Sequence, residues 1–336
     1  NMTKHPSNWL TIKPEGLYCI PGKFYIDPYF PVDHALITHG HSDHARFGHE
    51  HVLATQETLA IMNARFDMTQ TKQQTTAYHK NILLNQVLVS FLPAGHIIGS
   101  AQILLQYQNQ RCIFSGDYKR QDDPTCLPFA VTHCDVFITE STFAMPVFTH
   151  PPIHEELQKL FDSLKRFPER CHLIAAYTLG KCQRILLALR ALGYDRPIYF
   201  HGAMRKFCDL YQSFGFDFGE LILVSPENAS HLQGEIVFCP PYCLHDRWTR
   251  RLPNPLPIFA SGWMQIRARA KQKGVELPLV ISDHADWPAL TQTIHEVNAP
   301  EIWITHGLDE ALQYYATMHG FSARAVNLLH DIQDED

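Results

Sequence analysis

Six consecutive residues constrain this chain more than any other segment, and they read His39-Gly40-His41-Ser42-Asp43-His44. Three imidazoles and a carboxylate this close together are unsuited to a core, because each polar group would need a partner and protonated imidazoles would repel one another. A divalent metal ion removes both costs, since neutral imidazole and carboxylate are ligands that zinc accepts. The segment directly follows the apolar stretch 35–38, which reads as a strand. The sequence therefore predicts a metal site on a loop at the end of a strand.

One loop rarely completes a metal site, so further ligands are expected at the ends of other strands. The same order of an apolar stretch, a small residue and a donor recurs three times, in Pro93-Ala94-Gly95-His96, Ser115-Gly116-Asp117 and Thr305-His306-Gly307. Each of these donors taken singly also suits a structural role. As a set that follows the first motif, His96, Asp117 and His306 are predicted to be ligands.

The pattern of apolar residues changes along the chain. The first third reads as short strands, broken by one helix expected over 55–66. From 153 to 224 helical and strand patterns alternate, which implies a small parallel sheet. The tail resumes with a strand at 279–281, a helix at 287–297, a strand at 302–304 and a helix at 309–318.

Composition bounds the class of protein. With 336 residues, 45% apolar and 18% charged, the chain is expected to fold as roughly two globular domains rather than to be disordered. No apolar run approaches the ~20 residues that span a bilayer, so no membrane partner is expected. Nine irregularly spaced cysteines favour a reduced, cytoplasmic chain. The formal net charge of −6 does not by itself indicate a nucleic-acid binder.

In order and kind, these motifs resemble the metal ligands of the metallo-β-lactamase fold, and the chain looks like the β-CASP branch of nucleases. It is similar above all to the bacterial ligase-associated DNA exonucleases, over nearly its whole length, through 36–44, Ser115-Gly116-Asp117-Tyr118, 281–287 and Thr305-His306-Gly307. The resemblance implies an α/β fold. It would be a metallo-β-lactamase αββα sandwich formed by 1–145 and 263–336, with an inserted β-CASP-like α/β domain at 146–262.

The resemblance also implies a role for each motif residue. One metal ion would be held by His39, His41 and His96, and a second by Asp43, His44 and His306, with Asp117 bridging the two. Asp27 matches an acid that orients the ligand loop, and Glu140, His284 and His306 match the three motifs of the branch. Because a histidine stands at the third of these motifs, the resemblance implies two divalent ions, expected to be zinc with manganese as the alternative.

This set of residues suits the hydrolysis of a phosphodiester. Two cations ~3.5–4 Å apart can create a hydroxide and stabilise both the attacking and the leaving oxygen. The catalytic set would therefore include Asp43 and Asp117. His284 is not needed as a ligand, so we expect it to protonate the leaving oxygen as a general acid, while Glu140 holds its tautomer and keeps it protonated. The structural alternative is that His284 caps the helix that begins near Trp287.

Two segments are candidates for contacts with phosphate. The turn 177–181, with Thr178, Gly180 and Lys181, joins a strand to a helix and offers backbone N–H groups, a helix N-terminus and an ammonium. It resembles the terminal-phosphate pocket of the cross-link repair exonucleases; the alternative is a plain helix start with an exposed lysine. Lys119 and Arg120 form a second basic patch beside Asp117. Two zinc ions would reduce the net charge from −6 to about −2.

Four functions remain on these grounds. The leading hypothesis is a metal-dependent DNA exonuclease that acts on single-stranded or frayed ends in repair, with a DNA ligase and a helicase as pathway partners. An RNA-processing nuclease of the same branch is the main alternative. A thioester or lactam hydrolase is disfavoured by the inserted segment and by Glu140 and His284, and an inactive scaffold by the intact ligand set. Strand polarity stays open, with the phosphate pocket favouring a 5′ end.

Overall fold

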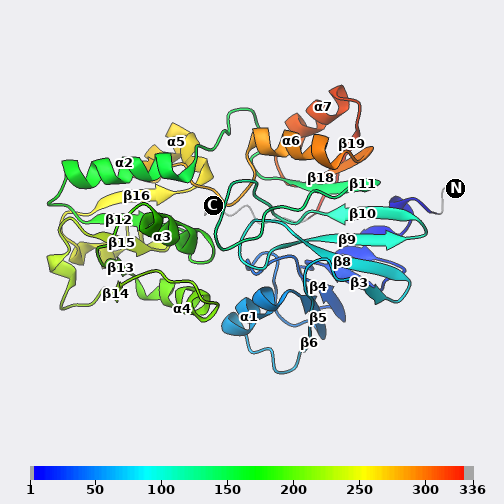
Figure 1. Cartoon of the computed structure of the whole chain (residues 1–336), viewed down its shortest axis with the longest axis horizontal. Helices are drawn as coiled ribbons and strands as arrows, with labels where there is room; N and C mark the ends of the chain where they lie inside the picture. Colours follow the sequence, from blue (N-terminus) through cyan, green and yellow to red (C-terminus); the bar gives the residue numbers. More distant parts are fainter. Residues whose placement is uncertain (1–3, 329–336) are drawn as a thin grey trace. The chain divides into compact units, whose positions relative to one another are not determined.

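The computed structural model describes residues 4–328, which form two compact units (Figure 1). The first unit contains the described residues up to Pro146 and those from His284 onward. The second unit is the continuous segment Val147–Asp283. The second unit is thus an insertion in the chain of the first, as the sequence analysis expected.

Two mixed sheets form the centre of the first unit. The first sheet has the spatial order β1 (Leu10–Lys13), β2 (Gly16–Cys19), β3 (Phe24–Ile26), β4 (His34–Leu36), β5 (His51–Ala54) and β6 (Lys72–Thr75). The second has the order β19 (Ser322–Ala325), β18 (Glu301–Gly307), β11 (Val136–Ser141), β10 (Gln110–Phe114), β9 (Ala101–Tyr107), β8 (Val87–Pro93) and β7 (Ile82–Leu84). Strands that precede the second unit in the chain and strands that follow it therefore share the second sheet.

Alternating side chains on these strands build the layers. Leu36 and Leu53 belong to a core shared with Val89 and Phe91 of the second sheet. Their neighbours Ala35 and Val52 point the other way and pack with α1 (Gln56–Arg65). This is the period of two that a strand imposes on its side chains.

The outer face of the second sheet is covered in the same way, by α6 (Trp287–Val297) and α7 (Asp309–Met318) (Figure 1). Ile113 and Ile304 of the sheet pack there with Leu290 and Leu312 of the helices. Helix, sheet, sheet and helix follow one another, which confirms the αββα sandwich.

The second unit contains a parallel sheet of six strands. Its order is β14 (Leu221–Leu223), β13 (Ile198–Phe200), β15 (Ile236–Cys239), β12 (His172–Ala175), β16 (Leu256–Ala260) and β17 (Leu277–Leu279). Its helices are α2 (Ile153–Arg166), α3 (Lys181–Ala191), α4 (Arg205–Ser213) and α5 (Arg267–Gln272). This alternation of strands and helices is the inserted α/β domain that the sequence predicted.

The second boundary of the insertion lies later than expected. From the sequence, this boundary is expected between Gly262 and Trp263, whereas the second unit continues to Asp283. The reason is β17, which pairs in parallel with β16 and so completes the sheet of the second unit. The three-residue strand Leu277–Leu279 contains a proline and was read from sequence as part of the first unit.

None of the helices in the described part of the chain is long and apolar enough to cross a membrane.

Candidate metal centre

The predicted ligands lie at or just beyond the carboxyl ends of strands. β10, β11 and β18 are parallel to one another, and β8 runs with them because both are antiparallel to β9. The loops that follow β8 and β10 carry His96 and Asp117, while His306 is the penultimate residue of β18. The six-residue motif follows β4 of the facing sheet. The sandwich thus brings side chains from distant segments to one edge.

Three imidazoles converge there as a first group. The donor atoms of His39, His41 and His96 all lie within 4.8 Å of one another. All three residues are buried, and His96 Nε2 lies 3.0 Å from His41 Nδ1. These are the three residues that the sequence analysis assigned to one metal ion.

Asp117 occupies the middle of the cluster. Its Oδ2 lies 3.2 Å from His44 Nε2, 3.4 Å from His39 Nε2 and 3.9 Å from His96 Nε2. A carboxylate oxygen at comparable distances from three imidazole nitrogens is suited to bridge two cations.

The second expected set is arranged around His44. Asp43 Oδ2 lies 3.5 Å from His44 Nε2, and the rings of His44 and His306 are 5.2 Å apart. His44 and His306 are buried, while the Asp43 carboxylate is 13% exposed. The more open side of the cluster is therefore this one.

Unsatisfied atoms provide a test of whether this cluster fits a metal ion. His39 Nε2, His44 Nε2 and Asp117 Oδ1 are buried and have no hydrogen-bond partner among the residues that the structure describes. Buried polar atoms in native proteins are nearly always paired, so three in one cluster require an explanation. A divalent ion would satisfy them, since each is an atom that coordinates zinc or manganese. The residues present fit such a group.

Electrostatics give His39 and Asp117 the protonation states that a cation needs. Burial lowers the pKa of His39 well below its usual range, and His44 and His96 lower it further, so the ring is neutral. For Asp117, burial would raise the pKa, but the charges of His44 and His284 outweigh it and hold the pKa well below its usual range. Asp117 is therefore a carboxylate, ready to accept a cation.

The protonation of His44 differs. Burial would lower its pKa, but the carboxylates of Asp117 and Asp43 outweigh this and raise the pKa well above its usual range. A metal ion bound there would therefore displace a proton.

Asp27 orients the motif loop from behind. Its Oδ1 accepts the Thr38 backbone N–H at 2.8 Å, and its Oδ2 accepts the Thr38 hydroxyl at 2.6 Å and His44 Nδ1 at 2.8 Å. With Nδ1 held in this way, His44 presents Nε2 toward Asp117. Thr38 in turn lies 3.0 Å from His39 Nδ1. Thr38 is not among the site residues predicted from the sequence, although its place directly before the motif and after Asp27 is a usable signal.

His284 and Glu140 form a pair at the edge of the cluster, where a donor atom of His284 lies within 4.8 Å of donor atoms of His96 and Asp117. His284 Nδ1 lies 3.0 Å from both carboxylate oxygens of Glu140, and its ring is 4.8 Å from that of His96. Glu140 is fully buried and also accepts the backbone N–H of Tyr118 at 2.8 Å. Ser115 Oγ accepts the N–H of Glu140 at 3.1 Å. Neither Tyr118 nor Ser115 was assigned a role from sequence.

The backbone at the site is held in unusual conformations. Asp27 and His306 have φ of 46° and 55°, in the left-handed region that residues with a Cβ seldom adopt. Gly307, at φ 138°, follows His306, and a Cβ there would meet the Ser141 carbonyl oxygen at 2.4 Å. Close packing of β18 on β11 therefore requires glycine at 307.

The expected basic patch beside Asp117 is largely buried. Lys119 is 1% exposed, and its Nζ donates to Asp123 Oδ2 at 2.7 Å and to the His96 carbonyl at 2.9 Å. Arg120 donates to Glu296 and Thr293. Because the ammonium of Lys119 is enclosed and neutralised by a carboxylate, it supports the His96 loop and is not a surface contact for DNA.

The turn at 177–181 is also closed. Lys181 is 1% exposed, and its Nζ lies 3.3 Å from the Ala260 carbonyl oxygen. The Gln183 side chain accepts the Gly180 N–H and donates to the Thr178 carbonyl oxygen. The backbone donor and the ammonium that were expected to read a terminal phosphate therefore have partners inside the second unit.

Comparisons with known proteins give partial matches. No family model matches the chain. A protein named "Probable DNA ligase" from Opitutus terrae is 27% identical over 314 residues, 93% of this chain and 30% of that protein. "Endoribonuclease ysh1" from Aspergillus fumigatus is 30% identical over 42% of this chain and 17% of its own length. "Cleavage and polyadenylation specificity factor subunit 3" from Dictyostelium discoideum is 28% identical over 46% and 21%. The chain thus spans less than a third of these relatives.

A solved structure gives a match in fold. The crystal structure of a protein of unknown function from Enterococcus faecalis superposes with a TM-score of 0.60, covering 88% of this chain and 80% of that one. The sequences are 14% identical, so the match concerns the fold alone. By its αββα sandwich with an α/β insertion, and by its sequence similarity to these relatives, the chain resembles the β-CASP nucleases of the metallo-β-lactamase fold.

Proposed function

We propose that this chain is a metal-dependent phosphodiesterase that acts as a DNA exonuclease on single-stranded or frayed ends in repair. The observation that carries the proposal is the Glu140–His284 pair, which lies directly beside a buried cluster of metal donors. A metal site alone would suit many hydrolases. A histidine held by a buried carboxylate next to that site adds a proton donor for a poor leaving group.

Divalent ions held by the seven donors would supply Lewis acidity toward a phosphodiester and charge for the attacking and leaving oxygens. The residues themselves then have separable tasks. Asp27 and Thr38 fix the orientation of His44 and the motif loop. Asp117 places its negative charge between three imidazoles.

His284 would deliver the proton. Its Nδ1 is engaged by Glu140, so Nε2 is the nitrogen that can carry the transferable proton. The buried Glu140 carboxylate favours the imidazolium form before transfer, because an opposite charge at hydrogen-bond distance stabilises it. The leaving 3′ or 5′ oxygen of the substrate would accept this proton.

A groove beside the centre supports a strand as substrate. A cavity of about 870 Å³ is lined by Gly307, which follows His306, and by Met145, Trp287, Tyr314 and Met318. The carboxylates of Asp309 and Glu310 also line it, so its contribution to binding would come from stacking and not from charge. Tyr314 is 70% exposed. Nucleic-acid bases stack on exposed aromatic rings regardless of sequence, so unpaired bases suit this surface. A small thioester or lactam would not need this extended aromatic surface for binding.

The relatives favour DNA, with RNA as the second candidate. The protein named as a probable DNA ligase matches 93% of this chain, whereas the proteins named as endoribonucleases match 41–43% of it. We accordingly propose DNA as substrate, a ligase and a helicase as pathway partners, and a cytoplasmic location. The alternative function, an RNA-processing nuclease, rests on the names of the relatives that are called endoribonucleases.

One assay separates the candidates. Purified protein with Mn²⁺ or Zn²⁺ is incubated with end-labelled single-stranded DNA, blunt duplex DNA, RNA of the same sequence and a thioester, with Asp43→Ala as the inactive control. We expect stepwise shortening of single-stranded DNA that stops on chelation. Internal cleavage of RNA with intact DNA would select the second candidate, and thioester hydrolysis alone would refute a nuclease.

The groove gives a first quantitative prediction. Tyr314→Ala should weaken the binding of single-stranded DNA about 5- to 150-fold, because a stacked base contributes about 1–3 kcal/mol. Tyr242→Ala is the matched control, since Tyr242 is equally exposed (71%) and lies in the second unit. Fluorescence anisotropy with a labelled, cleavage-resistant strand measures both. Equal affinities for the two variants would remove the groove from the path of the strand.

A further inference from the structure

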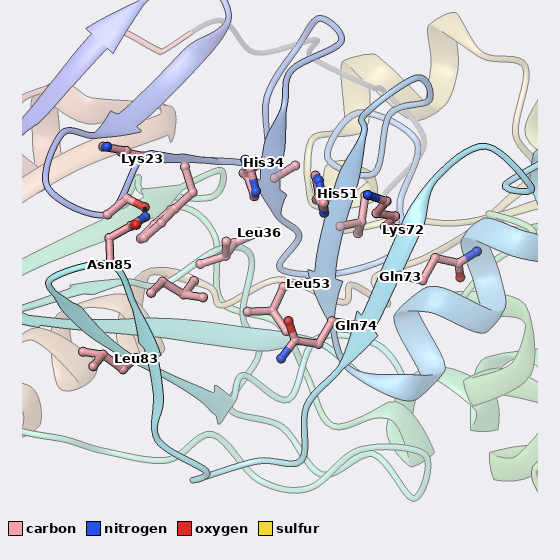
Figure 2. A pocket seen from close by; sticks show the side chains of 15 residues that line it. Lys23, His34, Leu36, His51, Leu53, Lys72, Gln73, Gln74, Leu83 and Asn85 are labelled. Atoms are coloured by element: carbon pink, nitrogen blue, oxygen red, sulfur yellow. Dashed lines mark hydrogen bonds between the residues drawn. The ribbon is translucent and has the colours of Figure 1, made fainter.

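A second cavity lies in the first unit, away from the metal donors. It has a volume of about 390 Å³ and lies against the first sheet and the β7–β8 hairpin (Figure 2). The metal-binding motif follows the carboxyl end of β4, whereas His34 of this cavity is the first residue of the same strand. All three residues of β4 line the cavity, but none of the fifteen described lining residues is a predicted metal ligand, so the cavity is a different site.

The polar row that borders this cavity stands where apolar residues are expected. His34 pairs with His51, and His51 pairs with Lys72, across the neighbouring strands β4, β5 and β6. Two residues further along, Leu36 and Leu53 of the same strands face the core between the sheets. Because strand side chains alternate, His34 and His51 share that inward face. Two imidazoles and an ammonium thus replace apolar side chains at the end of the sandwich.

The arrangement of these groups gives the site its charge. The rings of His34 and His51 are stacked, with centroids 4.3 Å apart and planes 3° from parallel. Lys72 continues the row on one side and Lys23 lies on the other (Figure 2). None of the fifteen described residues that line the cavity carries a carboxylate. Two ammonium groups with no lining carboxylate repel a metal cation and attract an anion.

The rest of the lining selects the kind of anion. Phe24, Leu36 and Leu53 are buried and form an apolar floor, and the side chain of Leu83 is 67% exposed at the rim. Gln74 and Asn85 add amide groups. A flat apolar ring with polar edges fits such a lining, and a phosphate fits the lysines and imidazoles.

We propose that this cavity, which we call the His34–His51 pocket, binds a nucleoside monophosphate. The phosphate would lie between Lys72 and the stacked imidazoles, and the base would pack over the apolar floor. The ligand is either a free nucleotide or the phosphorylated terminal nucleotide of a strand. The proposal does not depend on the metal centre or on nuclease activity.

A brominated ligand locates the site directly. Crystals of the metal-loaded protein are soaked with 5-bromo-2′-deoxyuridine 5′-monophosphate, and the anomalous signal of bromine is mapped. We expect a bromine peak in the His34–His51 pocket, apart from any peak at the metal centre. A peak at the metal centre alone, or none, would overturn the proposal.

Affinity measurements test the residues. Calorimetric titration with deoxyadenosine monophosphate measures the affinity of this site. Lys72→Ala and His51→Ala should each lower that affinity about tenfold or more, since each removes a contact to the phosphate. Lys80→Ala is the matched control, because Lys80 is an exposed lysine of the same unit outside the cavity. Unchanged affinity in both test variants would refute the assignment. Inorganic phosphate that competes as well as the nucleotide would refute recognition of the base.

A third experiment distinguishes a free nucleotide from the phosphorylated end of a strand. A 5′-phosphorylated, cleavage-resistant oligonucleotide is titrated beside the free nucleotide. If Lys72→Ala loses affinity for the oligonucleotide, the ligand is the phosphorylated end of a strand. If the affinity for the oligonucleotide is unchanged in Lys72→Ala, the pocket is assigned to the free nucleotide. Hydrolysis of bis-nitrophenyl phosphate is followed in parallel, and it should be equal in wild type and Lys72→Ala.

Discussion

At the scale of single residues, the predicted donors and the predicted basic contacts fared differently. The donor atoms of His39, His41 and His96 converge in the structure. This could be expected from the sequence, because several imidazoles placed close together need polar partners or a shared metal ion. Lys119 and Lys181 could not be placed from sequence, because a lysine is read as exposed unless its partner is known. Those partners are Asp123 for Lys119 and a backbone carbonyl for Lys181. Because every residue has a backbone carbonyl, the sequence does not show which one will accept a hydrogen bond from a lysine.

His284 carries the sharpest prediction at this scale. His284→Ala should slow cleavage of a strand about 100-fold or more, because the leaving oxygen loses its proton donor. A nitrophenyl leaving group needs no proton, so hydrolysis of bis-nitrophenyl phosphate should change little. His295→Ala, on the exposed face of α6, is the control for loss of a nearby histidine. If both substrates slow equally, His284 acts in some other way, and metal content by elemental analysis then tests it as a ligand.

His49 predicts how stability depends on pH. Burial lowers the pKa of His49 to about 4, and its Nδ1 accepts the Val32 N–H at 3.2 Å. The unfolded chain binds this proton near pH 6.5 and the folded chain only near pH 4. Stability is therefore full above pH 6.5 and falls as the pH drops toward 4, by roughly 3 kcal/mol.

The matched variant for this effect is His49→Asn, which keeps an acceptor for Val32 without a titrating ring. Urea unfolding of both proteins at pH 7.5 and pH 4.5 gives the comparison. The loss of stability between the two pH values should be smaller in His49→Asn. Identical losses would show that other groups account for the acid sensitivity.

At the scale of elements, periodicity located the helices and missed the polar strands. The pattern predicted helices at 287–297 and 309–318, and α6 and α7 have those bounds. No strand was predicted at β6, whose sequence Lys-Gln-Gln-Thr has no apolar residue and whose side chains are all exposed. Its strand conformation comes from pairing with β5, which a local pattern does not contain.

The junction of β11 and β18 gives a prediction for an element. Gly307→Ala should cost more stability than Gly320→Ala, because both residues have positive φ but only a Cβ at 307 meets backbone, at 2.4 Å. We expect about 1 kcal/mol for the control, from backbone conformation alone, and at least about 3 kcal/mol at Gly307. Chemical unfolding measures both. Equal costs would mean that β11 moves aside freely.

The loop after β8 is supported by the buried pair Lys119–Asp123, and a double-mutant cycle tests that support. Lys119→Met should cost about 3–5 kcal/mol, because it leaves the Asp123 carboxylate buried without its cation. Adding Asp123→Leu should restore much of the stability. Metal affinity should stay reduced in the double variant, since the contact to the His96 carbonyl remains lost. Full recovery of metal affinity would show that the lysine serves stability alone.

At the scale of the whole molecule, two units with separate sheets predict two responses to metal removal. All seven predicted ligands lie in the first unit. A bound ion stabilises only the unit that holds it, by about 4 kcal/mol at a thousandfold excess over Kd. Chelation should therefore increase hydrogen exchange in the strands β8, β10 and β18 and leave β12 and β15 unchanged. Equal increases in both sets of strands would contradict this.

The arrangement of domains was predictable to the extent that the chain signals it. The insertion follows from a change of pattern near 150, and the structure places the first boundary at Pro146. The second boundary was predicted too early in the chain, because β17 belongs to the second unit. β17 pairs with β16 through backbone hydrogen bonds, which cannot be inferred from its side chains. Boundaries set by sheet pairing lie beyond local sequence reasoning.

The left-handed backbone at Asp27 and His306 has a consequence for how such a protein can be improved. Each conformation costs about 1–3 kcal/mol, which glycine would largely recover. His306→Gly would thus relieve the backbone while deleting a predicted ligand. A library of variants selected for heat resistance in the absence of metal would accumulate such changes and lose the proposed metal centre first. Engineering toward stability would have to select on metal-loaded protein, so that the gain from coordination outweighs the relief of strain.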